Sequence, residues 1–201
     1  MSIDFAVMYA THDAFRRDLA RLATAAGQGE TDRPGVRAGW ENFTRQLDVH
    51  HTVEDAVLWP RVLTALTDRP RDRELMAAME AEHAALHPAL DSVEEGFRRP
   101  TRDLAERVDT LARILGDHME HEESSALPLI QEVLTTKDWG DFRGAMARKQ
   151  GPSGAAVYVP WVLDGATPRQ RHTFLAAMPR PVSMINTALW ERRYRNRNWW
   201  R

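Results

Sequence analysis

Two stretches of the chain repeat a pair of residues that could bind a metal ion together. In each stretch a His is followed four positions later by a Glu, and a Pro comes six positions after the Glu. The residues are His50, Glu54 and Pro60, then His118, Glu122 and Pro128. Residues i and i+4 lie on one face of an α-helix, so each pair would direct an imidazole and a carboxylate toward the same place. Two such pairs, 68 residues apart, predict a shared metal centre.

A second repeat adds two more His residues on apolar helical stripes. His12, Phe15, Leu19 and Leu22 match His83, Leu86, Leu90 and Val93 at a constant separation of 71 residues. Taken alone, a core-facing His is commonly a hydrogen-bonded buried imidazole, and a single His-x-x-x-Glu is commonly a surface pair. The combined pattern favours a metal site, because polar groups gathered on apolar stripes need partners or a cation.

The composition restricts the chemistry of such a site. The chain has no Cys, which excludes disulfides, thiolate nucleophiles, iron–sulfur clusters and Cys-type zinc sites. An imidazole and carboxylate set suits iron, manganese or zinc, and affinity alone does not choose among these metals.

Four long helical segments are predicted to position these residues. The first spans residues 2 to 26, with Ser2 as its N-cap and Gly27 and Gly29 ending it. The second follows a break at residues 27 to 34, with Thr31 or Asp32 near its cap, and Pro60 kinks or ends it. The third starts near Pro70 and ends around residues 96 to 100, and the fourth is capped by Thr101 and runs to about Leu134. These segments predict an all-α fold, an up-down-up-down four-helix bundle with a short helical C-terminal extension.

Charge and hydrophobicity exclude several partners. The net charge is −2 and 43% of the 201 residues are hydrophobic, so nothing draws the whole chain to nucleic acid or to an anionic membrane. The N-terminus lacks a basic region followed by a long apolar run, and no apolar segment is long enough to span a bilayer. We therefore expect a cytoplasmic protein.

These motifs resemble those of the hemerythrin-like proteins, also called the HHE cation-binding family, over roughly residues 5 to 135. The resemblance implies two non-haem iron ions inside a four-helix bundle, bridged by carboxylates, with an oxo or hydroxo bridge left open. The metal ligands that it implies are His12, His50, Glu54, His83, His87, His118 and Glu122. The ferritin-like alternative uses two Glu-x-x-His motifs, and here only Glu80 and His83 have that spacing.

The chain departs from the oxygen carriers of that family. The carriers have His-x-x-x-x-Asp in the fourth helix, whereas His118 and Glu122 are four positions apart, which puts reversible oxygen carriage in doubt. Some members carry a Glu directly after the His of the second helix, where this chain has His51. We therefore expect His51 not to be a metal ligand, but to be solvated or to lie between helices.

Other candidates remain open. His87 lies four positions after His83, where the carriers place a second ligand, although Pro88 follows it. His121 is expected beside the site rather than in it, and His172 is given no role. Asp55 and Glu123 either accept hydrogen bonds from ligand imidazoles or face water.

Residues 137–201 differ in composition from residues 1–136, which we take as the boundary of the bundle domain. Five of the seven Trp lie after residue 136, and the last twelve residues interleave Arg with aromatic residues. Thr167 and Pro168 predict the start of a short helix. The tail could bind nucleic acid or a membrane, but we expect its aromatic residues to pack on the bundle, with no nucleic-acid or membrane partner.

Two classes of function follow from these expectations. The favoured one is a di-iron protein that binds and reacts with O2, H2O2 or NO, including an oxidoreductase that consumes peroxide or NO. The alternative is a module that senses O2, NO or iron, or binds iron, and acts through a partner. The oligomeric state is left open.

Overall fold

The computed structural model describes residues 2–99 and 103–200, and in this part of the chain every regular element is helical. The order is α1 (Ala6–Gln28), α2 (Pro34–Val53), η1 (Glu54–Leu58), α3 (Trp59–Ala65), α4 (Pro70–Arg98), α5 (Leu104–His121), η2 (Glu122–Ala126), α6 (Leu127–Val133), α7 (Thr136–Leu163), α8 (Pro168–Ala176), α9 (Arg180–Ile185), η3 (Asn186–Trp190) and α10 (Glu191–Arg195). The all-α prediction is confirmed.

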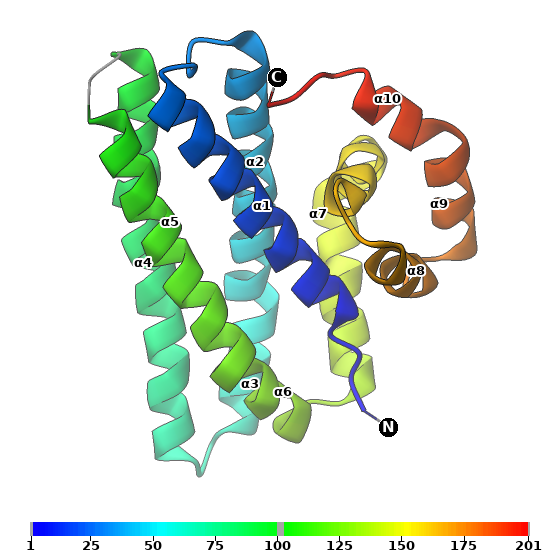
Figure 1. Ribbon diagram of the computed structural model, residues 1–201. Coiled ribbons are helices and arrows are strands. Elements are labelled where there is room, and N and C mark those ends of the chain that lie inside the picture. The colour runs from blue at the N-terminus through cyan, green and yellow to red at the C-terminus, as the bar shows by residue number, and fades with distance from the viewer. Residues whose placement is uncertain (1, 100–102, 201) are drawn as a thin grey trace.

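Helices α1, α2, α4 and α5 lie lengthwise beside one another (Figure 1). Helix α5 contacts α4 on one side and α1 on the other, and α1 also contacts α2. The helices after residue 135 stand on the α1 and α2 side of the molecule, where α7 packs on both and α8 packs on α1. The extension therefore covers one side of the structure and leaves the α4 side without such a cover.

Two helical rods contain a π-helical turn at corresponding places. The turn η1 joins α2 to α3, and η2 joins α5 to α6. In each, the first residue is the Glu of the repeated motif, whose carbonyl accepts from the N–H five residues later. Pro60 therefore does not end its helix, which continues to Ala65. Proline has no N–H and so cannot form the usual backbone hydrogen bond of an α-helix. The π turn that precedes Pro60 is the irregularity that accommodates it within the helix.

Several predicted helix ends are corrected. The first helix starts at Ala6 rather than at Ser2 and extends through Gly27 to Gln28, because only Gly29 takes the left-handed conformation that ends it, with φ of 70°. The N-cap of α2 is Arg33, directly after Thr31 and Asp32, which were predicted near it. The third helix begins at Pro70 as predicted, and Thr101, the predicted cap of the fourth, lies outside the described residues.

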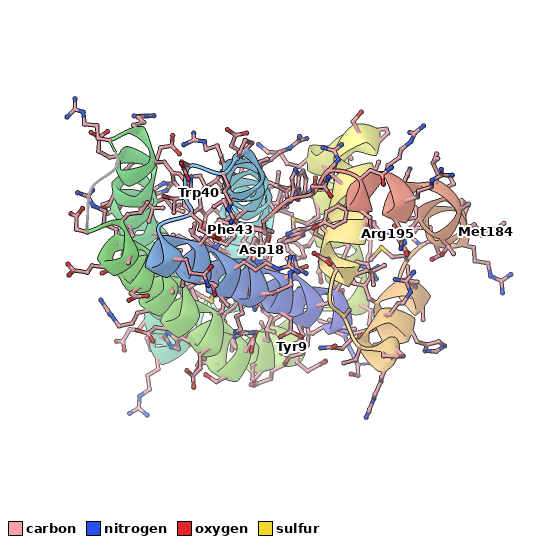
Figure 2. The ribbon with its side chains drawn as sticks, turned by 45° about the horizontal axis from the view of Figure 1, so that its top comes forward. Tyr9, Asp18, Trp40, Phe43, Met184 and Arg195 are labelled. Atoms are coloured by element: carbon pink, nitrogen blue, oxygen red, sulfur yellow. The ribbon has the colours of Figure 1, made fainter. Side chains whose placement is uncertain are left out.

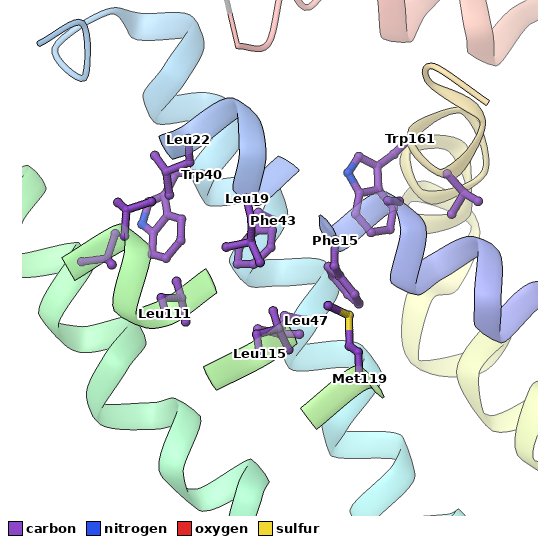
Figure 3. Packing of buried hydrophobic residues seen from close by; sticks show 14 of the residues in the cluster. Phe15, Leu19, Leu22, Trp40, Phe43, Leu47, Leu111, Leu115, Met119 and Trp161 are labelled. Carbon is purple, nitrogen blue, oxygen red and sulfur yellow. The ribbon is translucent and has the colours of Figure 1, made fainter. Parts of the chain in front are cut away.

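The core consists of two apolar clusters. The larger contains Phe15, Trp40, Phe43, Leu115 and Trp161, several of which are seen in Figure 3. The smaller contains Trp59, Met76, Ile130, Trp139 and Phe142. The extension contributes Trp161 to the first and Trp139 and Phe142 to the second, so these aromatic side chains of the extension are part of the core.

The candidate site lies between the two clusters. On α1, His12 comes between Met8 of the smaller cluster and Phe15 of the larger. His83 on α4 likewise comes between Met79 and Leu86. Along the helix axes, the inward-facing His residues therefore lie between the two apolar clusters.

A buried carboxylate fixes the extension to α1. Asp18 is fully buried, and Trp161 Nε1 donates to it at 2.7 Å. Arg17 donates to the carbonyl oxygen of Trp161 at 2.8 Å, and Arg21 pairs with Asp164 at 2.7 Å. Figure 2 shows Asp18 in the interior, whereas Met184 projects from the solvent side of the extension.

The end of the chain packs on α2. The N–H of Trp200 donates to the carbonyl of Gly35 at 2.8 Å. A Cβ added to Gly39 would lie 2.4 Å from an atom of the Trp200 ring, so this glycine makes room for the indole. Helix α8 starts with Thr167 as its N-cap and Pro168 in its first turn, as predicted.

Within the described residues, the structure contains no helix with the length and apolar character needed to cross a membrane.

Candidate metal centre

Two groups of potential metal ligands lie in the interior. The first comprises His12, His50 and Glu122, and the second comprises His51, His83 and His118. Within each group, one ligand atom from each residue lies within 4.8 Å of the others. These are the two such groups in the part of the chain that the structure describes.

The imidazoles meet in pairs through their Nε2 atoms. His12 Nε2 lies 3.2 Å from His50 Nε2, and His83 Nε2 lies 3.1 Å from His118 Nε2. The first pair joins α1 to α2 and the second joins α4 to α5, as the internal repeat requires. Each pair therefore directs two nitrogen atoms at one point.

Carboxylates hold the opposite nitrogen of three of these rings. The Nδ1 atoms of His12, His83 and His118 lie 2.7 to 2.9 Å from an oxygen of Glu123, Asp55 and Glu82 respectively. An ionised carboxylate only accepts, so Nδ1 carries the proton and the Nε2 lone pair faces inward. Metal-bound imidazoles typically have this outer partner.

Those contacts resolve one open alternative and reveal a residue that the sequence did not indicate. Asp55 and Glu123 accept hydrogen bonds from imidazoles of the site instead of facing only water. Glu82 accepts from both His118 and His121. No motif marks Glu82, because it acts across the interface between α4 and α5; its only signal is that it directly precedes His83.

The two motif glutamates lie between the imidazole pairs. Glu54 has one oxygen 3.1 Å from His50 Nε2 and the other 3.7 Å from His83 Nε2, so it extends from one pair to the other. Glu122 has an oxygen 3.2 Å from His12 Nε2. Both side chains are fully buried, and none of their four oxygens has a hydrogen-bond partner in the structure.

Unpartnered buried carboxylates are costly unless a cation neutralises them. Burial and the nearby Glu122 raise the pKa of Glu54 well above its usual value. Burial would raise the pKa of Glu122 too, but His12 outweighs it and lowers this pKa to about 2. On the protein's own charges, then, only one of the two carboxylates is readily ionised. Metal cations between them would satisfy both, so the residues present fit a metal centre.

The imidazoles respond to the same environment. Burial would lower the pKa of His12, but Glu122 and then Glu123 raise it to about 9. Burial and the charge of His12 lower the pKa of His50 well below its usual value. Burial likewise lowers the pKa of His118. On the protein's own charges His12 is therefore protonated at pH 7, whereas His50 and His118 are neutral, which is the form that binds metals. His12 would lose its second proton on binding a metal.

His51, rather than His87, joins the second group. The His51 ring stacks on His83 with 4.0 Å between centroids and lies 5.4 Å from His118. Burial and the neighbouring His83 lower the pKa of His51. His87 is exposed and belongs to neither group.

The remaining candidate residues, His121, Glu80 and His172, belong to neither ligand group. His121 pairs with Glu82 at 2.7 Å and does not face the centre of either group. Glu80, the acid of the ferritin-like spacing, is exposed on α4, and His172 is exposed on α8. The structure therefore brings neither of the last two to the site.

A groove leads from the surface to the second group. It has a volume of about 390 Å³ and is lined by residues of α2, η1 and α4, including His51, Asp55, His83 and His87. Small molecules and ions could thus approach the His83 side of the site between these helices.

Comparisons with known proteins agree with this geometry. The family model of the hemerythrin HHE cation binding domain matches residues 4–130. No curated protein and no solved structure matches the chain. The matched residues include every member of the two ligand groups and stop before α7.

Proposed function

Because this chain belongs to the hemerythrin HHE cation-binding family, we propose that it is a non-haem di-iron protein that binds and reacts with O2, H2O2 or NO. The observation that carries the proposal is the position of Glu54. This buried, unpartnered carboxylate directs one oxygen to each of two imidazole groups.

The proposed ligands form two unequal sets. His12 and His50 would hold one iron, and His51, His83 and His118 the other, with Glu54 and Glu122 shared between them. His87, which the family resemblance places among the ligands, is left out of the set. The iron beside His12 would have fewer imidazole ligands and therefore more room for an exchangeable ligand.

Bound iron would supply the redox and Lewis-acid chemistry that small oxidants require. The chain orients the imidazoles through Glu123, Asp55 and Glu82, each of which fixes a proton on Nδ1. The apolar clusters lie above and below the centre. Consumption of peroxide or NO is the reaction class that we favour.

The same centre could instead act as a sensor. In that reading, the protein holds O2, NO or iron and signals through a partner. Turnover distinguishes the two readings, because a sensor binds the small molecule stoichiometrically without consuming it. The groove beside His51 and His83 supports access to the centre in both cases.

We further propose that α1, α2 with α3, α4, and α5 with α6 form an up-down-up-down bundle over residues 1–136. Residues 137–201 are then an extension packed on it, which the core positions of Trp139 and Trp161 support. A cytoplasmic location remains a prediction of the sequence.

The test is metal content. The purified protein should contain about two irons per chain, with an optical spectrum that changes on exposure to O2, H2O2 or NO. A variant with both Glu54→Ala and Glu122→Ala should lose most of the metal, because each carboxylate serves both ions. Glu120→Ala, at an exposed position of the same helix as His118, is the matched control. Full metal occupancy in the double variant would contradict the proposal.

A further inference from the structure

One imidazole of the site lacks the outer partner that the others have. His50 is 2% exposed, yet its Nδ1 has no hydrogen-bond partner in the structure. Its internal-repeat counterpart, His118, uses Glu82 for this purpose. Glu82 directly precedes His83, and the residue that directly precedes the matching His12 is Thr11. The repeat therefore supplies a carboxylate in one half of the site and a hydroxyl in the other.

The hydroxyl of Thr11 is occupied elsewhere. Thr11 Oγ1 donates its only proton to the carbonyl of Val7 at 2.8 Å. It also lies 2.7 Å from the hydroxyl of Tyr158, so Tyr158 must be the donor in that contact. Burial raises the pKa of Tyr158 to about 12, which keeps the phenol protonated. Neither hydroxyl proton is left over for a ligand.

His50 also lines a cavity of about 370 Å³. Thr11, His50 and Tyr158 form part of its wall. Most of the remaining lining is apolar and comes from the extension, including Trp139, Phe142, Met146, Met178 and Val182. These residues lie beyond the stretch that the family model matches.

The same cavity has one cationic group in its wall. Arg143 is half-buried and donates to the carbonyl of Ala177. Among the described residues, no carboxylate forms an ion pair with Arg143. An unpaired cation beside apolar side chains would be stabilised by an anion.

We propose that this cavity binds a small apolar monocarboxylate. Its carboxylate would accept from His50 Nδ1 and pair with Arg143, and its apolar part would lie against Phe142, Met146 and Val182. It would thus supply to His50 the acceptor that Glu82 supplies to His118. The volume is within the range of small-molecule sites, roughly 300 to 1,000 Å³.

The proposal rests on the proposed function at one point. When a metal binds Nε2 of His50, the proton of that ring must be on Nδ1, which is then a donor. The remaining features are Arg143 and the apolar lining, most of which comes from the extension.

Calorimetry with three probes of similar size tests the charge preference. Benzoate, benzamide and benzylamine would be titrated into the full-length protein as purified with its metal and again after chelation. Benzoate should bind at least tenfold more tightly than benzamide, because charge-assisted hydrogen bonds are stronger than neutral ones. Benzylamine should bind weakest, since its charge repels that of Arg143. Equal affinities for the three probes would overturn the proposal.

Variants locate the probe. Ala155→Phe places a ring at a half-buried position in the cavity wall and should reduce benzoate affinity at least tenfold. Ala176→Phe, on the exposed side of α8 and outside the lining, is its control. Ala147→Phe, at an exposed position of the lining, gives a second way to narrow the cavity if Ala155→Phe does not fold. Benzoate binding that survives both lining variants would mean direct binding to the metal and would overturn the proposal.

Arg143→Met should remove the preference for benzoate over benzamide, and Arg148→Met, on the exposed side of the same helix, should keep it. The two proposals fail separately. A protein that binds no metal but takes benzoate in the cavity refutes only the di-iron function. A protein that holds two irons but shows no benzoate binding sensitive to Ala155→Phe refutes only the carboxylate site.

Discussion

The two halves of the candidate site come from one repeated pattern but differ in their surroundings. On the α4 and α5 side, His83 and His118 have carboxylate partners, and His51 joins them. On the α1 and α2 side, only His12 has such a partner, while His50 lines a cavity whose wall comes mostly from the extension. The comparison teaches that a repeat fixes which residues converge, and that the elements packed outside it can make its two halves chemically different.

The largest expected effect is the loss of metal when a ligand His is replaced, and its size should differ among the His residues. His50→Ala leaves one imidazole in its group. The metal affinity of that group should therefore fall by more than the roughly 10- to 100-fold that loss of an outer hydrogen-bond partner costs. His51→Ala leaves two imidazoles in the other group and should cost less. His87→Ala should leave metal content unchanged, because this exposed side chain is outside both groups.

Metal titration by calorimetry or by atomic emission measures this order. A loss of iron in His87→Ala equal to that in His51→Ala would show that the ligand set of the second group differs from the proposed one.

The outer carboxylates should give the next largest effect. Asp55→Ala and Glu123→Ala each remove the acceptor of an Nδ1 proton and should lower metal affinity roughly 10- to 100-fold. Thr11→Val should change metal affinity little, because the Thr11 hydroxyl does not contact His50 in the structure. Competition with a chelator measures all three, and similar losses in all three would remove the distinction between the halves.

Thr11→Glu would make the two halves alike. The new carboxylate would occupy the position that corresponds to Glu82 and could accept from His50 Nδ1. We expect metal affinity on that side to rise by up to about tenfold, and benzoate binding to disappear because the new anion takes its place. A variant that keeps both metal affinity and benzoate binding unchanged would show that residue 11 does not face His50.

The smallest expected effect is on stability, at the ion pair that attaches the extension to α1. Asp164 is joined to Arg21 at 2.7 Å and accepts from Tyr194. Burial would raise the pKa of Asp164, but Arg21 outweighs it and lowers this pKa. Its stabilising contribution is therefore present above the unfolded pKa of about 3.9 and is lost as pH falls through the lower folded value.

Asp164→Asn should accordingly cost about 1 kcal/mol of unfolding free energy at pH 7, since the carboxylate is partly exposed. The difference from the original protein should vanish toward pH 2. Urea unfolding at several pH values measures it, and a difference that grows as pH falls would contradict the sign.

The sequence by itself determined what depends on local geometry. Residues four apart on a helix share a face whatever surrounds them, so His50 with Glu54 and His118 with Glu122 were recognisable as inward-facing pairs. Apolar periodicity likewise predicted the helices, and Thr167 with Pro168 predicted the start of α8. The boundary of the bundle domain and the identity of the metal stay predictions.

Only the tertiary structure decided what depends on which helices meet. Whether His51 or His87 approaches His83 is set by the packing of α2 against α4, which the spacing along either helix does not specify. Glu82 serves His118 across the interface between α4 and α5. The cavity beside His50 exists because α7 and the residues after it pack there, and contacts between segments so distant in sequence leave no periodic trace in the chain.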